Sequence, residues 1–210
     1  MKKITRKKHL EMRLQSIPAH PKPKVGLEQY TTPSVIASDL IWNAYSLGDV
    51  EDKTVVDLGC GTGIFAIGSA LMGADSSIGV DIDEDSIRLA QEVKDKLKLT
   101  NLNFIVRDIS DINEGWNVDT VFQNPPFGSQ KNAESGQDLK FVQKAIELNT
   151  KVLYSFHMQS TEEFLMKYYD DNGLEITHIF RYKFPIPKIY DFHTKEKQNV
   201  DVIVIRAILK

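Results

Sequence analysis

Cysteine is nearly absent from this sequence, which has only Cys60 among its 210 residues. A single cysteine excludes an internal disulfide and is typical of a reducing compartment, so we expect a cytoplasmic location. Histidine is also scarce, and the five histidines show none of the spacings typical of a metal site. We therefore expect no bound metal.

Long apolar runs are missing as well. No segment approaches the roughly 20 apolar residues that a membrane-spanning helix needs. No apolar stretch follows the basic residues 1–8, as it would in a secretory signal, so we expect neither a signal nor contact with a membrane. The composition, with 41% hydrophobic and 26% charged residues, instead suits a single α/β domain over residues 1–210.

Net positive charge is absent too, because the formal net charge is −3. This value alone disfavours a nucleic-acid-binding protein, but the basic residues are clustered. Five of the first eight residues are Lys or Arg, and lysines alternate with aromatic residues in segment 183–197. Cations for phosphates and rings for splayed bases are what an RNA-binding surface uses. Each cluster is equally compatible with an ordinary solvated surface.

The hydrophobic pattern predicts strands with helices between them. Strands are expected at residues 54–58, 77–80, 103–106, 118–122, 152–156, about 175–183 and about 200–209. The first five alternate with helices, which predicts a parallel sheet with right-handed crossovers. No helix separates the last two, so they should pair antiparallel. The sequence thus predicts an α/β, Rossmann-like domain with a seven-stranded, mostly parallel sheet, one antiparallel strand and helices on both faces.

Capping residues predict where two of the helices begin. Thr32-Pro33 is typical of an N-cap followed by proline at the first helical position. The helix that follows would bury an apolar stripe made of Val35, Ile36, Leu40 and Ile41. Segment 160–163 has the pattern of a capping box, which predicts another helix start at that point.

Glycines cluster where the first predicted strand ends, in the run Asp57-Leu58-Gly59-Cys60-Gly61-Thr62-Gly63. Glycine allows a tight turn and lets a ligand lie against bare backbone. Asp81 lies 18 residues beyond Gly63, close to the roughly 20-residue spacing that places a carboxylate on a ribose. Asp108 follows the third strand. The sequence therefore predicts a nucleoside-containing cofactor at the carboxyl ends of the strands.

Two cofactors fit a glycine turn of this kind. The residues Gly61-x-Gly63-x-x-Ala66 satisfy the permissive dinucleotide pattern, so spacing alone leaves NAD open. The additional Gly59 and the leading Asp57 resemble the signature of class I methyltransferases, in which the acid faces the ammonium group of S-adenosylmethionine. No later segment resembles a nicotinamide half-site, which favours S-adenosylmethionine. A cofactor there would cover Cys60, which we interpret as a small turn residue and not as a nucleophile.

The segment Asn124-Pro125-Pro126-Phe127 directly follows the fourth predicted strand and should border the same cleft. Its prolines fix an extended backbone. An amine conjugated to a ring is a poor nucleophile, and accepting its hydrogen bonds through the Asn124 side-chain oxygen and the Pro125 carbonyl would raise the electron density on the nitrogen. Phe127 offers a ring for stacking. We interpret these four residues as catalytic, for methyl transfer to a planar exocyclic nitrogen.

Together these motifs resemble the methyltransferase-like protein 5 family of archaeal and eukaryotic N6-adenine methyltransferases of small-subunit ribosomal RNA. The resemblance covers nearly the whole chain and rests on the segments Lys22–Lys24, Leu27–Thr32, Asp57–Gly63, Gly79–Asp85, Asn124–Gly128, Tyr154–His157 and Arg181–Lys195. It implies a class I, S-adenosylmethionine-dependent RNA methyltransferase. Residues 1–50 would hold a basic helix, a linker and a helix that covers the cofactor, and residues 51–210 the catalytic core.

The resemblance also implies which residues hold the cofactor. They are Gln29 and Thr32 over the methionine part, Asp57, Gly59, Gly61, Thr62 and Ile64 along the turn, Asp81 at the ribose, and Asp108 with Ile109 at the adenine. Eukaryotic relatives work with a small zinc-containing, Trm112-like activator subunit. The resemblance therefore allows such a partner here, beside the RNA substrate.

Two rival functions stay open at this point. Protein glutamine-N5 methyltransferases use a similar Asn-Pro-Pro-aromatic segment, but usually with tyrosine and with a separate N-terminal helical domain. This chain has Phe127 and only about 50 residues before the first predicted strand. The second rival is an inactive RNA-binding scaffold, which the intact segment at Asn124 disfavours.

Overall fold

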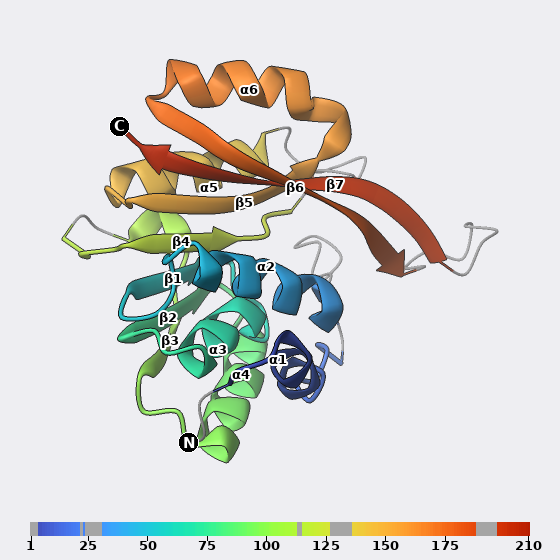
Figure 1. Ribbon diagram of the computed structural model, residues 1–210. Coiled ribbons are helices and arrows are strands. Elements are labelled where there is room, and N and C mark those ends of the chain that lie inside the picture. Colours follow the sequence, from blue (N-terminus) through green and yellow to red (C-terminus); the bar gives the residue numbers. More distant parts are fainter. Residues whose placement is uncertain (1–3, 22, 24–30, 113–114, 127–135, 188–196) are drawn as a thin grey trace.

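The computed structural model describes residues 4–21, 23, 31–112, 115–126, 136–187 and 197–210. Seven strands form one sheet in the order β3-β2-β1-β4-β5-β7-β6 (Figure 1). They are β1 (Thr54–Leu58), β2 (Ser76–Asp81), β3 (Leu102–Val106), β4 (Thr120–Gln123), β5 (Val152–Met158), β6 (Leu174–Pro187) and β7 (Lys197–Leu209). β7 is antiparallel to β5 and β6, and the other neighbours are parallel. The predicted seven-stranded sheet with one antiparallel strand is confirmed.

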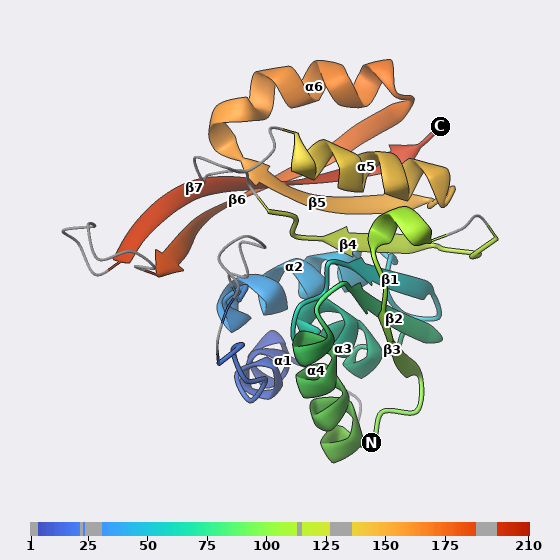
Figure 2. The ribbon, with the colours of Figure 1, turned by 180° about the vertical axis from the view of Figure 1, so that it is seen from behind.

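Helices cover both faces of this sheet, as the sequence predicts (Figures 1 and 2). They are α1 (Lys7–Leu14), α2 (Ser34–Ser46), α3 (Ile64–Leu71), α4 (Glu84–Leu97), α5 (Gln137–Glu147) and α6 (Glu162–Asp171), with short 3₁₀ turns η2 (Ile109–Asp111) and η3 (Gln159–Thr161). Within the described part of the chain, none of the helices has the length and apolarity needed to span a bilayer.

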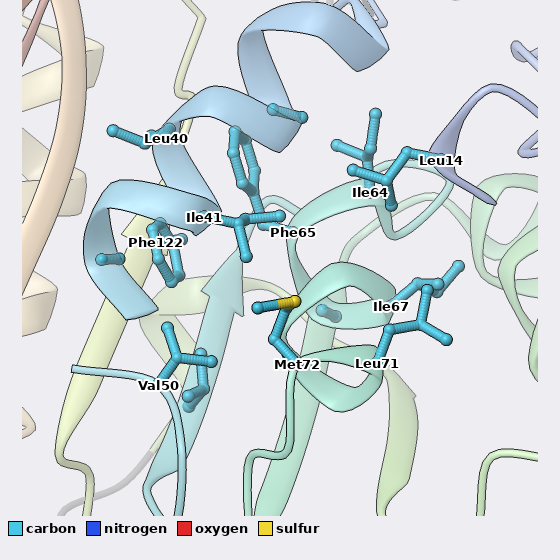
Figure 3. Packing of buried hydrophobic residues seen from close by; sticks show 14 of the residues in the cluster. Leu14, Leu40, Ile41, Val50, Ile64, Phe65, Ile67, Leu71, Met72 and Phe122 are labelled. Carbon is cyan, nitrogen blue, oxygen red and sulfur yellow. The ribbon is translucent and has the colours of Figure 1, made fainter. Parts of the chain in front are cut away.

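Alternate strand residues face opposite layers, because side chains alternate along a strand. Val55 of β1 belongs to the core beneath α1 to α4, whereas Val56 belongs to the core beneath α5 and α6. Figure 3 shows the first of these cores, with Ile41 of α2 and Phe65 of α3 pointing into the same region. Phe65 stacks on Phe122 of β4 at a centroid distance of 5.4 Å. This packing fixes the strand ends that carry the candidate site.

The start of α2 corrects one prediction. The helix begins at Ser34, the Pro33 carbonyl accepts from the amide of Ala37, and Thr32 does not act as its N-cap. The Thr32 hydroxyl instead accepts from Asn124 Nδ2 at 3.0 Å. Val35 is also wrongly predicted as buried, since it is 56% exposed. A helix turns by about 100° per residue, so the face that buries Ile36, Leu40 and Ile41 turns Val35 away.

The start of α6 corrects a second prediction. The helix starts where predicted, at Glu162, but Ser160 and Thr161 belong to the 3₁₀ turn η3 and the predicted side-chain cap is absent. Thr161 Oγ1 donates to the Met158 carbonyl at 2.8 Å, and no amide of the first turn of α6 donates to it.

The last two strands are longer than predicted. β6 runs on to Pro187 and β7 begins at Lys197, so the pair projects beyond the rest of the sheet as a long two-stranded arm (Figures 1 and 2). β6 is an edge strand, where a proline such as Pro185 is tolerated because its nitrogen need not donate to a neighbour. Proline usually breaks a strand, so the sequence pattern predicted an earlier end for β6, at about residue 183.

Candidate functional site

The carboxyl ends of the parallel strands surround a cavity of about 880 Å³. This is where open α/β sheets bind ligands, and the volume suits a cofactor together with part of a substrate. All nine described residues predicted to hold the cofactor line the cavity: Thr32, Asp57, Gly59, Gly61, Thr62, Ile64, Asp81, Asp108 and Ile109. Asn124 and Pro126 line it as well, while Pro125 is buried behind them. Gln29 and Phe127 lie outside the described residues.

The glycine turn combines tight packing with one open position. Gly59 and Gly63 have positive φ, and a Cβ on them would come within 2.9 Å of the Phe141 ring and 2.6 Å of the Phe104 ring, respectively. Gly61 also has positive φ (52°), but a Cβ there would meet no atom within 4 Å. Gly61 therefore exposes bare backbone to the cavity, whereas Gly59 and Gly63 make room for the protein itself.

Asp81 braces this turn. One of its carboxylate oxygens accepts from the Gly61 amide at 2.7 Å, and the other accepts from the Asp83 amide at 2.9 Å. Burial raises its pKa, against the effect of these two amides. Each carboxylate oxygen can accept more than one hydrogen bond, so Asp81 keeps capacity for a ligand hydroxyl.

Asp57 has a less satisfied environment. It is 1% exposed, and its Oδ2 accepts from the Ala66 amide in the first turn of α3 at 3.0 Å. Its Oδ1 is buried without a hydrogen-bond partner among the described residues. Burial raises the pKa of Asp57 to about 7, opposed by the Ala66 amide and reinforced by the charge of Asp81. A buried carboxylate with a free oxygen is suited to a cationic ligand group.

Asn124 also keeps one acceptor unused. Its Nδ2 donates to Thr32, while its Oδ1 is buried and has no partner within the part of the chain that the structure describes. The hydrogen bond ties the segment before α2 to the end of β4. It also fixes the plane of the Asn124 amide, so the side-chain oxygen is held in a defined position beside the cavity.

Asp108 serves the backbone as well as the cavity. Its Oδ1 accepts from the amide and the hydroxyl of Ser110, both at 2.9 Å, which caps the turn η2. Asp108 and Ile109 thus hold the turn that follows β3, and they form the cavity wall at that strand end.

Sequence reasoning missed one wall of the cavity. Gly136, Gln137, Leu139 and Phe141, at the beginning of α5, line it. The sequence did contain a signal for this wall. The helix α5 is the next element after the segment at Asn124, and that segment follows the strand end that borders the cavity. His20 also lines the cavity, but nothing in its Pro-rich surroundings marks it as a site residue.

His20 belongs to a small cluster with Asp83 and Asp85, whose ligand atoms lie within 4.8 Å of one another. His20 Nε2 is 3.3 Å from Asp83 Oδ2. The two carboxylates already have other roles: Asp83 caps α4 through Ser86, and Asp85 pairs with Arg88 at 3.4 Å. We assign no metal to this cluster.

Known proteins resemble the chain over nearly its whole length. A family model described as a methyltransferase domain matches residues 49–170. An uncharacterised protein of Methanocaldococcus jannaschii is 41% identical, covering 97% of this chain and 94% of its own. The rRNA N(6)-adenosine-methyltransferase METTL5 of Danio rerio is 34% identical, with 95% and 97% covered. The crystal structure of a candidate RNA methyltransferase from Pyrococcus horikoshii has a TM-score of 0.86 at 38% identity and 98% coverage of both chains.

The seven-stranded sheet, the glycine turn and the acids at the strand ends define a class I S-adenosylmethionine-dependent methyltransferase. Within that class, the matches over nearly the full length of both chains are decisive. The chain belongs to the METTL5 family.

Proposed function

We propose that this enzyme methylates N6 of an adenine in ribosomal RNA, and that its substrate is the RNA of the small subunit. The observation that carries the proposal is the Asn124 Oδ1 atom, a buried acceptor without a described partner at the edge of the cofactor cavity. Family membership supports adenine as the target, because relatives that match over more than nine tenths of this chain are named rRNA N(6)-adenosine-methyltransferases.

The residues around the cavity fit S-adenosylmethionine. The free oxygen of Asp57 suits an ammonium group, the carboxylate of Asp81 suits ribose hydroxyls, and the bare backbone of Gly61 allows close approach. Thr62, Ile64, Asp108 and Ile109 would complete the pocket, with Gln29, Thr32 and Gly59 beside them. When bound, this cofactor supplies an electrophilic methyl group on a sulfonium.

Asn124 would then act on the nucleophile. Its Oδ1 and the carbonyl of Pro125 accept hydrogen bonds from the two N–H groups of the adenine amine. These bonds direct the nitrogen lone pair at the methyl group and raise the electron density on the nitrogen. Pro126 keeps this backbone extended, and Phe127 stacks on the base. Holding the two reacting groups in line supplies much of the rate, so no general base is required.

Contacts at Asp39 support a joint RNA-binding surface. Asp39 of α2 accepts from Lys7 of α1 at 2.6 Å and from the Tyr182 hydroxyl of β6 at 2.9 Å. The basic N-terminal helix and the β6–β7 arm therefore meet at one carboxylate. Lys183 on the arm is 75% exposed and forms an ion pair with Asp201. Exposed pairs of this kind are weak, so a phosphate can compete for the lysine.

A labelling experiment with four substrates tests the proposal. The purified chain is incubated with labelled S-adenosylmethionine and with small ribosomal subunits, large subunits, protein-free ribosomal RNA, or a release factor. Enzymatic digestion then identifies the labelled residue. We expect N6-methyladenosine from the small subunit or its RNA. Label in glutamine of the release factor, with none in RNA, establishes the rival protein methyltransferase. Binding of RNA without transfer to any substrate supports the inactive scaffold.

Two further properties belong to this proposal. A Trm112-like activator subunit is a partner that the family resemblance allows, and its addition to the same assay shows whether the rate depends on it. The cytoplasm is the compartment that we propose, on the ground of the single cysteine.

A further inference from the structure

A chain of buried hydrogen bonds connects the end of β4 with the start of α5. The Gln123 amide lies 2.9 Å from Ser155 Oγ, and Ser155 bonds to the Tyr169 hydroxyl. The Tyr169 hydroxyl lies 2.9 Å from His157 Nε2, and His157 Nδ1 lies 2.8 Å from Asp138 Oδ2. Gln123, Ser155, His157 and Tyr169 are fully buried. The methyl-transfer steps described above use none of these side chains.

Each ring nitrogen of His157 faces an oxygen atom. Burial raises the pKa of Tyr169, so its hydroxyl stays protonated and has one proton, which it can donate to Ser155 Oγ or to His157 Nε2. At the other ring nitrogen the Asp138 carboxylate is the acceptor, so His157 Nδ1 donates to it.

The network ends on both sides of the catalytic segment. Gln123 directly precedes Asn124, and Asp138 lies in the first turn of α5. With the Gln123 amide oriented so that its oxygen accepts from Ser155, its nitrogen also donates to the Phe141 carbonyl at 3.1 Å. Figure 2 shows α5 beside β4 and β5, next to α6.

The first turns of α5 matter because they form a wall of the cavity. Phe141 packs so closely on the cofactor turn that a Cβ on Gly59 would lie 2.9 Å from its ring. A shift of α5 would therefore move both this wall and Gln123, the residue that directly precedes Asn124. Misplacement of a bound substrate by about 1 Å can cost about 100-fold in rate.

We propose that His157 is a positioning residue for methyl transfer: by holding Asp138 it fixes the start of α5, and with it the segment that begins at Asn124. This inference rests on the proposed function. His157 is not among the residues that line the cavity, and its hydrogen bond to Asp138 is its link to the start of α5.

Asp138 provides the main test, because its side chain is 23% exposed and its replacement should leave the chain folded. Asp138→Ala removes the acceptor of the His157 proton, and we expect the single-turnover rate of methyl transfer to fall about tenfold, with the cofactor Kd unchanged. Asp138→Asn keeps an acceptor oxygen and should restore most of the rate. His157→Ala should resemble Asp138→Ala, and the double variant should be no slower than either single one.

Glu163→Ala is the matched control, since Glu163 is likewise an acid in the first turn of a helix, α6, but lies outside this network. Its rate should equal that of the wild type. Equal rates for wild type and Asp138→Ala, or a lower rate in Asp138→Ala that Asp138→Asn does not restore, would overturn the positioning role.

Amide hydrogen exchange at residues 139–141 separates this inference from the proposed function. We expect faster exchange there in Asp138→Ala and His157→Ala, and unchanged exchange in Glu163→Ala. If the wild type methylates no adenine, the proposed function fails, and the exchange data still show whether His157 fixes α5. Unchanged exchange in both variants contradicts the anchoring itself.

Discussion

The two ends of strand β1 place the same acid in opposite settings. Asp49, five residues before the strand begins, is 6% exposed and fully paired: Arg206 donates to both of its oxygens at 2.8 and 3.0 Å, and the Tyr154 hydroxyl donates at 2.5 Å. Asp57, near the other end, is 1% exposed but keeps one oxygen without a described partner. The two carboxylates are similarly buried and differ in how completely the protein satisfies them.

This contrast separates stability from function along one strand. At the amino end, the hydrogen bond from Arg206 to Asp49 raises the pKa of the guanidinium, and Arg206 also bonds to Thr177 at 2.6 Å. At the carboxyl end, Asp57 and Asn124 both hold an unused acceptor beside the cavity. Buried polar groups without partners are costly and are expected where a ligand completes them. The fold is fixed at one end of the strand and left ready for a ligand at the other.

The largest expected effect concerns the paired end. Arg206→Met leaves the Asp49 carboxylate buried without its cation, and we expect a loss of about 3–5 kcal/mol in the free energy of unfolding, with the cofactor Kd unchanged. Lys183→Met, which breaks an exposed pair with Asp201, should cost less than about 1 kcal/mol. Denaturant unfolding and calorimetry measure both. A similar loss in the two variants contradicts the structural role of the Asp49 pair.

A smaller effect separates two glycines of the same turn. Gly63→Ala imposes a φ of +85° on alanine and presses its methyl group against Phe104, so it should destabilise the fold by about 2 kcal/mol. Gly61→Ala meets no protein atom and should cost about 1 kcal/mol for its positive φ. Its main effect should be weaker cofactor binding, measured by calorimetry. Equal cofactor affinities in Gly61→Ala and wild type would show that the open position does not face the cofactor.

The smallest expected effect concerns the protonation of Asp57. Because the pKa of Asp57 is raised to about 7, this group favours folding below pH 3.8, and that contribution is lost as the pH rises through about 7. The wild type should therefore lose stability relative to Asp57→Asn over that range.

A cationic ligand group beside Asp57 lowers its pKa, so cofactor binding at pH 7 should release about half a proton. Calorimetry in two buffers of different ionisation enthalpy measures this release, and its persistence in Asp57→Asn would assign it to another group.

Local patterns predicted the strands and the glycine turn because their causes are local. A buried strand needs a run such as 54–58, and a tight turn needs glycine at positions such as Gly61 and Gly63. The same logic placed Asp81 and Asn124 at strand ends, where the topology brings them together.

Long-range partners could not be predicted in this way. Asp49 and Arg206 are 157 residues apart in the sequence, and Asn124 and Thr32 are 92 apart. Nothing in the sequence near Thr32 distinguishes a helix cap from a residue that holds the Asn124 amide. Such pairs depend on how the whole sheet assembles, and the sequence pattern describes only its pieces.

The most direct test of the role proposed for Asn124 is single-turnover methyl transfer by Asn124→Ala. The assay uses saturating cofactor and ribosomal RNA as substrate, and the cofactor Kd is measured alongside. We predict that the variant binds the cofactor as the wild type does and transfers methyl groups at least about 100-fold more slowly. Asn117→Ala, at an exposed position before the amino end of β4, serves as the matched control and should transfer normally. Normal transfer by Asn124→Ala, or loss of cofactor binding together with transfer, would contradict the assignment of Asn124 to the nucleophile.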